Sequence, residues 1–339
     1  MPALARRRRS RLPTIVGVLA VLALVWTGLW FLAVDVARSA LARWLEREAN
    51  EGRAWSCDAP ETGGFPLGIE LRCPGIALAV ETAEGRRKAT AGAFSAGASL
   101  LRPGAIVASL AAPLEAGPLR LTWSHLELTV LGPPLDFASA TLTLARPVAS
   151  RADAILGQAE TAALTVVPAP GIAASEHALQ AQLEVAKAAV PQLDALDRSA
   201  APLDLDLQAV ATRTDAAADL DWPGWLESWR AAGGRIDVGR ARLAKAPVEL
   251  IGAGTLSLDA AHRVQGSFDA GAAGIEALAA QAGVPLGALK LGGLLGALGG
   301  GKAASGPGAG LPYQLRVKLK DGKVQAGPLQ LPLRLTPLY

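Results

Sequence analysis

The sequence predicts a β-rich (α+β) chain, in which one N-terminal transmembrane helix precedes a long curved antiparallel sheet of hairpins with a few covering helices. Two observations carry this prediction: an uncharged apolar run near the N-terminus, and a body of short alternating segments separated by prolines and glycines. Alternation with a period of two gives a strand one apolar side and one wet side. Aromatic residues make up only 4% of the chain, so burial in the body must depend on Leu, Val and Ala.

The N-terminus combines a basic tail, residues 1–11, with an uncharged run over residues 12–34. This run is long enough to cross a hydrocarbon core of roughly 30 Å as a helix, and the positive-inside rule keeps the tail in the cytoplasm. A signal peptide cleaved after "ALA", Ala40 to Ala42, is the alternative. An uncleaved anchor is favoured because the apolar part of a signal peptide spans about 7–15 residues. Both interpretations export the body.

The two cysteines, Cys57 and Cys73, lie sixteen positions apart just beyond the anchor. Since disulfides persist outside the cytoplasm, we expect them to be bonded. "AWSC" and "FPLGIELRC" are expected to form a first hairpin around "PETGG", with the bond against the core. Two buried free thiols are the alternative. A metal site is disfavoured because no histidine lies near, and a CxxC redox motif is absent.

Beyond the anchor, residues 35–52 predict a juxtamembrane helix with Trp44 as a packed or interfacial aromatic, and residues 53–339 predict one exported β-rich domain. Alternating strands are expected in "GFPLGIELRC", "LDFASATLTL", "HALQAQLEV" and "PLDLDLQA". Asp321-Gly322 predicts a hairpin with a two-residue turn. In "LRLTWSHLELTV" the apolar parity changes at His125, which predicts a β-bulge.

Two helical segments interrupt the strands. "WPGWLESWRAAGG" places Trp222, Trp225 and Trp229 on one helical face and ends at two glycines. Residues 275–298 predict two short helices with a break near Pro285. The glycine-rich residues 299–310 predict a flexible loop.

Catalytic constellations are weak in this sequence, and we expect no enzyme, no cofactor and no metal. His125, His177 and His262 are isolated, which favours solvated or hydrogen-bonded structural histidines. Ser95 lies in "GAFSAGAS", which does not meet the G-x-S-x-G pattern. Asp204 and Asp206 share the wet side of a predicted strand, where carboxylates usually serve solvation.

The net charge of +3 comes largely from the N-terminal arginines. The exported part is therefore nearly neutral or slightly acidic. This composition argues against nucleic acid as a partner.

Three segments together resemble a family of exported alphaproteobacterial proteins catalogued as domain of unknown function 2125. They are "GFPLGIELRC" after an anchor, the tryptophan-bearing helix before "GGRIDVGRARL", and the ending "LKDGKVQAGPLQLPLRLTPLY". Gly68 departs from the pattern, where a larger residue is expected. The resemblance implies a single-pass inner-membrane protein with a periplasmic body, and it brings no activity. More distantly, the organisation is similar to the AsmA-type envelope proteins, which are implicated in lipid movement between membranes.

Two functions follow as hypotheses. In the first, an apolar sheet face binds lipid or acyl chains in envelope maintenance, with Leu142, Leu144, Leu203, Leu205 and Leu207 as the candidate lipid-facing residues. In the second, the same face docks another envelope protein, and the chain is a structural scaffold. A period-two pattern serves either one, so the arrangement of the covering helices must discriminate between them.

Overall fold

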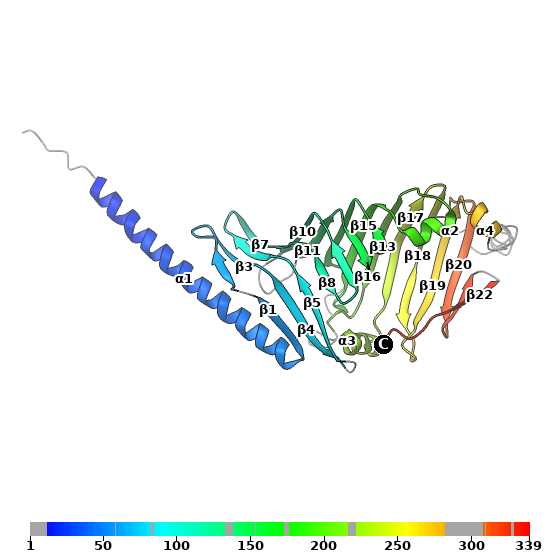
Figure 1. Cartoon of the computed structure of the whole chain (residues 1–339), viewed down its shortest axis with the longest axis horizontal. Coiled ribbons are helices and arrows are strands. Elements are labelled where there is room, and N and C mark those ends of the chain that lie inside the picture. Colours follow the sequence, from blue (N-terminus) through cyan, green and yellow to red (C-terminus); the bar gives the residue numbers. More distant parts are fainter. Residues whose placement is uncertain are drawn as a thin grey trace, which may run out of the picture.

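The computed structural model describes residues 12–339, apart from residues 58, 83–84, 133–137, 153, 173–175, 216–221, 282–307, 309 and 327–328. Figure 1 shows a long helix, α1, at one end of an elongated β-rich body whose strands succeed one another away from the helix. The described strands pair antiparallel throughout, as the alternating segments predicted. The predicted fold class is confirmed.

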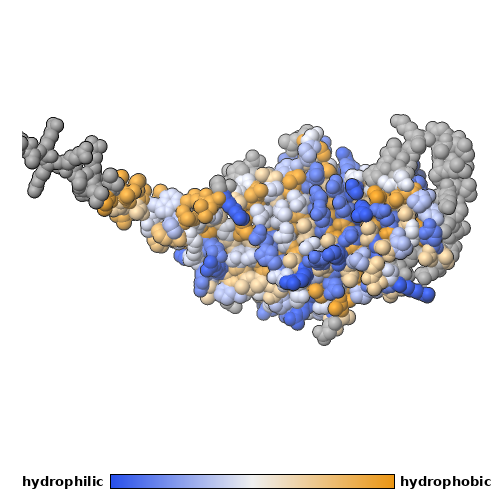
Figure 2. Space-filling model, turned by 90° about the horizontal axis from the view of Figure 1, so that it is seen from above, coloured by the Kyte–Doolittle hydropathy of each residue, from blue (hydrophilic) through white to orange (hydrophobic). Residues whose placement is uncertain are grey.

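The helix α1 runs without interruption from Leu12 to Asn50, so the predicted anchor and juxtamembrane helix are one element. Its outer part exposes hydrophobic side chains, as Figure 2 shows along the free end of the helix. From Trp30 onward one stripe of the helix turns toward the body, and Val34 on that stripe is buried. Further along, the ring centroids of Trp44 and Trp55 lie 5.9 Å apart, and Trp44 keeps 38% of its surface exposed.

The described strands form two sheets of seven and fifteen strands. The short sheet has the strands β1 (Arg53–Cys57), β4 (Ile76–Thr82), β5 (Gly85–Ala91), β8 (Leu114–Ala116), β9 (Leu119–Thr122), β12 (Val148–Arg151) and β13 (Ala154–Gln158), adjacent in that order.

The long sheet begins with β2 (Glu61–Gly63), β3 (Gly68–Cys73), β6 (Phe94–Ser99), β7 (Arg102–Leu110), β10 (His125–Leu131), β11 (Ser139–Ala145), β14 (Thr161–Pro168) and β15 (Leu179–Ala188). It continues with β16 (Leu203–Ala211), β17 (Ile236–Lys245), β18 (Val248–Leu258), β19 (Val264–Ala273), β20 (Tyr313–Lys320), β21 (Lys323–Ala326) and β22 (Leu329–Arg334). Strands β11, β15 and β16 confirm the strands predicted in the three alternating segments that follow "GFPLGIELRC".

Between β3 and β14 the chain passes from one sheet to the other through six short links, which we call the seam. The links are residues 74–75, 92–93, 111–113, 123–124, 146–147 and 159–160. Several of these links are hydrogen-bonded to a neighbouring link; the Gly92 N–H, for example, donates to the Ala111 carbonyl at 3.2 Å. A Cβ at Gly92 would lie 2.7 Å from that oxygen, so this close approach requires glycine.

The seam corrects the bulge predicted at His125. The parity changes there because the chain leaves the short sheet after Thr122 and enters the long sheet at His125. Trp123 holds this crossing, since its indole Nε1 donates to the Leu110 carbonyl at 2.7 Å. Each strand keeps its own strict alternation, and the change marks the step between sheets.

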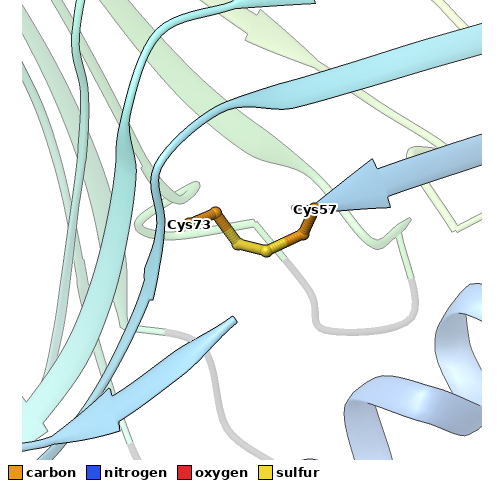
Figure 3. Close-up of a disulfide and its surroundings, with 2 residues drawn as sticks. All are labelled: Cys57 and Cys73. Carbon is orange, nitrogen blue, oxygen red and sulfur yellow. A yellow bond between two sulfur atoms is a disulfide. The ribbon is translucent and has the colours of Figure 1, made fainter. Parts of the chain in front are cut away.

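The disulfide between Cys57 and Cys73 is present (Figure 3), with Cα atoms 5.5 Å apart. The hairpin predicted around it is wrong. Strand β1 pairs with β4, whereas β3 pairs with β2 and β6. The bond therefore joins the short sheet to the long sheet, because the chain crosses between them after Cys57 instead of turning back on itself.

The covering helices are α2 (Pro191–Asp197), α3 (Trp222–Ala231) and α4 (Glu276–Gln281). In α3 the three predicted tryptophans stack in sequence, with ring centroids 5.5 and 6.2 Å apart. Figure 1 shows α2 and α4 along one border of the long sheet and α3 along the other. The second helix predicted before residue 298 lies outside the described residues, as does most of the loop over 299–310.

The C-terminal hairpin is confirmed. Strands β20 and β21 pair in register around Asp321-Gly322, both at positive φ, 53° and 71°. This conformation is the one that an Asp-Gly turn of type I′ requires.

Candidate functional site: an apolar inner face

The disulfide establishes which sides of the two sheets face each other. Cys73 lies on the side of β3 whose partner on β6 is Phe94, and Cys57 lies on the side of β1 whose partner on β4 is Ile76. Since the two sulfur atoms are bonded, these sides point toward one another. We call them the inner face. They carry most of the apolar side chains of both sheets, as alternation predicts.

Strand register aligns the inner face of the long sheet into rows that run across the strands. One row, which we call the leucine row, takes a single leucine from each of five adjacent strands, β10, β11, β14, β15 and β16. Its members, each paired with the next, are Leu128, Leu142, Leu164, Leu183 and Leu207. Five strands spaced about 4.8 Å apart give this row a length of about 19 Å.

The candidate residues Leu144 and Leu205 lie in the next row, which also holds Ala162 and Val185. All five leucines selected from the sequence thus share the inner face. Three members of the leucine row, Leu128, Leu164 and Leu183, were not selected. Alternation identifies the apolar side of each strand, but only register shows which residues lie side by side.

The inner face is incompletely covered. None of the described residues in the strands of the short sheet is buried, and the four candidates Leu142, Leu144, Leu205 and Leu207 are only half-buried. At the α1 end of the face Ile106 keeps 52% of its surface exposed. Two sheets in close contact would bury such residues almost fully. Part of the apolar surface of the inner face therefore remains accessible.

Near β17–β20 the two borders of the inner face are closed. The α3 helix covers one border with Leu226 and Trp229, which form a core with Leu258. At the other border the buried ammonium of Lys245 lies 3.2 Å from Asp194 of α2.

Leu203 is the register partner of Lys245, and the Leu203 side chain is buried. Leu203 therefore differs from the other four candidate leucines, which are half-buried. Tyr313 closes the same border farther along, where its hydroxyl donates to Glu276 of α4 at 3.0 Å.

Charged side chains gather on the opposite, outer face. Arg242 lies 2.9 Å from Glu249 on neighbouring strands, and a hydrogen bond from the Arg72 guanidinium lowers the pKa of Glu70. Asp204 accepts a hydrogen bond from the Lys187 backbone at 2.9 Å on this face. In the long sheet between β10 and β19, the inner face holds one charged residue among those described, Lys245. On the short sheet, register places Arg53, Arg87 and Arg151 on the inner side. The long-sheet part of the inner face therefore suits an apolar ligand.

The candidate polar residues occupy separate places. His125 lies 3.8 Å from Glu127, and His177 lies 3.3 Å from Asp215. His262 stacks on the Tyr339 ring at 4.3 Å. Within the described ranges, no group of three His, Cys, Asp or Glu residues could hold a metal ion.

The Ser95 hydroxyl shares a hydrogen bond with Ser109 at 2.9 Å. Both serines lie on the outer face, opposite the apolar row formed by Ala96 and Ala108.

The fold and the inner face define a class of protein: a long apolar N-terminal helix followed by an open, two-sheet antiparallel body. The helix suggests a single-pass membrane anchor, and the disulfide fits an oxidising compartment. The chain belongs to the bacterial family described as "uncharacterized protein conserved in bacteria (DUF2125)", whose model matches residues 30–332. The resemblance seen in the sequence is confirmed for this family, whereas the link to AsmA-type proteins is not shown. No curated protein and no solved structure matches the chain.

Proposed function

We propose that this protein binds a lipid or a free acyl chain on its inner face while α1 holds it beside a membrane. The observation that carries the proposal is the leucine row, five aligned leucines on a face that the short sheet leaves incompletely covered. Its length of about 19 Å exceeds the roughly 15 Å thickness of one hydrocarbon leaflet, half of a core of about 30 Å. An acyl chain laid along the row would contact leucine over most of its length.

Energetics support a ligand on this face. Apolar surface removed from water stabilises by about 25 cal/mol per Å², and half-buried leucines retain surface to cover. The charges on the outer face bind one another in ion pairs such as Arg316–Asp269, at 2.5 Å. In this proposal the protein binds and presents its ligand without catalysing a reaction.

The proposed location is the bacterial inner membrane, with the N-terminal arginines in the cytoplasm and the body in the periplasm. The basic tail before the apolar run supports this orientation. The disulfide supports an oxidising compartment for the body. Lipid and the membrane itself are then the proposed partners, and nucleic acid is not.

A scaffold that docks another envelope protein is the second candidate. It is favoured by Trp222, which ends the α3 stack and keeps 66% of its surface exposed. Exposed tryptophan is enriched at protein interfaces. An interface there would leave the inner face free.

Photo-crosslinking in nanodiscs tests the lipid proposal with the full chain. A benzophenone amino acid replaces Leu164 on the inner face or, as the control, Thr165 on the outer face of the same strand. We expect lipid adducts by mass spectrometry at Leu164 alone, because lipid around α1 does not reach β14.

A second variant tests the same face from a neighbouring strand. Leu142→Arg should abolish the adduct at Leu164, its register partner, whereas Thr143→Arg on the outer face should preserve it. The disulfide and the circular dichroism spectrum report whether each variant folds. If a folded chain forms only intramolecular adducts at Leu164, the lipid proposal is wrong and the scaffold gains.

A further inference from the structure

Two turns of the long sheet lie next to the apolar part of α1. The turn between β2 and β3 is "GFPLG", and its Pro66 carbonyl accepts a hydrogen bond from the Trp26 indole at 3.0 Å. The Gly68 carbonyl accepts one from the Trp30 indole at 2.7 Å. The ring of Phe65 meets the Trp30 ring edge-on, with centroids 5.4 Å apart. This turn is therefore fixed to the helix within the stretch expected to span the membrane.

The turn between β6 and β7 lies beside the first. The backbone N–H of Leu100 donates to the Leu67 carbonyl at 2.8 Å. Four large apolar side chains of the two turns are exposed: 52% for Phe65, 48% for Leu67, 55% for Leu100 and 75% for Leu101. We call these four residues the apolar tip. Figure 2 shows hydrophobic side chains gathered again where the helix meets the body.

The helix sets the depth of the apolar tip. The apolar run begins at Leu12, directly after the basic tail. At about 1.5 Å per residue, Trp26 lies about 21 Å and Trp30 about 27 Å along the helix from that point. The hydrocarbon core is about 30 Å thick. The first charged residue after the run, Asp35, lies about 35 Å along, beyond the core. A tilt of about 20° would bring the two tryptophans deeper still.

We propose that the apolar tip inserts into the membrane leaflet on the body's side, so that the near end of the long sheet touches lipid directly. Both turns are hydrogen-bonded at a depth that falls within the core or at its boundary, and the side chains they expose there are apolar. Arg102, the next residue after Leu101, has an exposed side chain. A lipid bilayer is the occupant because the tip continues the surface of the anchor helix. This inference does not depend on lipid occupying the inner face.

Site-directed fluorescence tests the insertion on the full chain in single-copy nanodiscs. The native cysteines are bonded to each other, so a cysteine introduced by Leu101→Cys can be labelled selectively with bimane. The control is Leu338→Cys, another exposed leucine at the C-terminal end. Lipids that carry a nitroxide on the acyl chain should quench the label at Leu101 several times more strongly than the label at Leu338. The emission maximum of the label at Leu101 should also lie at a shorter wavelength than that of the label at Leu338.

Two results would overturn the proposal that the apolar tip inserts into the membrane. Equal quenching at the two positions, with emission typical of water at Leu101, overturns the insertion. A label at Leu101 that is shielded from aqueous iodide but not quenched by lipid also overturns it, because another protein surface then covers the tip. A label that is quenched by the nitroxide lipids, combined with a failure of the benzophenone adducts, leaves insertion standing while the lipid-binding proposal falls.

Discussion

Breaking the Cys57–Cys73 bond should loosen one border of the protein selectively. Among the described strands, β1 is an edge strand paired with β4, and the bond fastens it to the long sheet. The bond closes a loop with a sequence separation of 16, for which the chain-entropy relation gives about 3 kcal/mol. Opening of β1 should therefore become roughly a hundredfold more frequent after reduction. Contacts from α1, such as Glu48 to Arg53 at 2.7 Å, persist and set the remaining protection.

Amide hydrogen exchange read by mass spectrometry measures this opening strand by strand. Reduction of the wild-type chain changes no side chain other than the sulfurs, and Cys57→Ser with Cys73→Ala provides an independent check. Exchange in β1 should accelerate in both samples, whereas β17 and β18, packed under α3, should not change. If thiol labelling shows both sulfurs free while β1 keeps its protection, the bond does not hold the two sheets together and the reasoning fails.

Two further predictions concern α3. Trp229→Ala should lower the free energy of unfolding by about 3–5 kcal/mol, because Trp229 is 4% exposed and its Nε1 donates to a backbone carbonyl at 2.7 Å. Urea denaturation measures this loss. The control, Trp222→Ala, should leave the free energy of unfolding nearly unchanged. Glu227 accepts hydrogen bonds from Arg230 and Tyr339, which lower its pKa from 4.5 to about 2. Its contribution is therefore complete above the unfolded pKa and lost as pH falls toward 2. The stability difference between wild type and Glu227→Gln should shrink from about pH 6 to about pH 3, and a constant difference would contradict the assignment.

The sequence predicted those features that depend on neighbouring residues. Alternation located β11, β15 and β16, tryptophan spacing located α3, and Asp321-Gly322 located the last hairpin. The compartment argument predicted the disulfide. The first hairpin was wrong because strand pairing is set by partners far along the chain, which alternation does not report. The same limit hid the leucine row, since Leu128 and Leu207 fall in one row only through the register of the strands between them.

The change of apolar parity at His125 marked a crossing between two sheets, whereas a β-bulge was predicted from the sequence. In a chain that crosses between two sheets, each crossing restarts the alternation, so a change of parity beside a tryptophan or a proline can mark a seam. The link before β12 has Pro147 and the link before β8 has Pro113. A two-sheet arrangement was therefore detectable in principle, but only by comparing the phases of successive segments.

The unbroken course of α1 limits how the body can move. From Leu29 to Asn50 the helix contains neither glycine nor proline, and it is fastened to the body at Trp30, by Arg38 to Thr62, and at Glu48. The helix α1 and the body should then move as one rigid unit, with no hinge between them. Changes in bilayer thickness that alter the tilt of the helix would swing the far end of the long sheet through a wide arc. For a membrane-spanning α1, the distance between the membrane and the far end of the body would then depend on bilayer thickness.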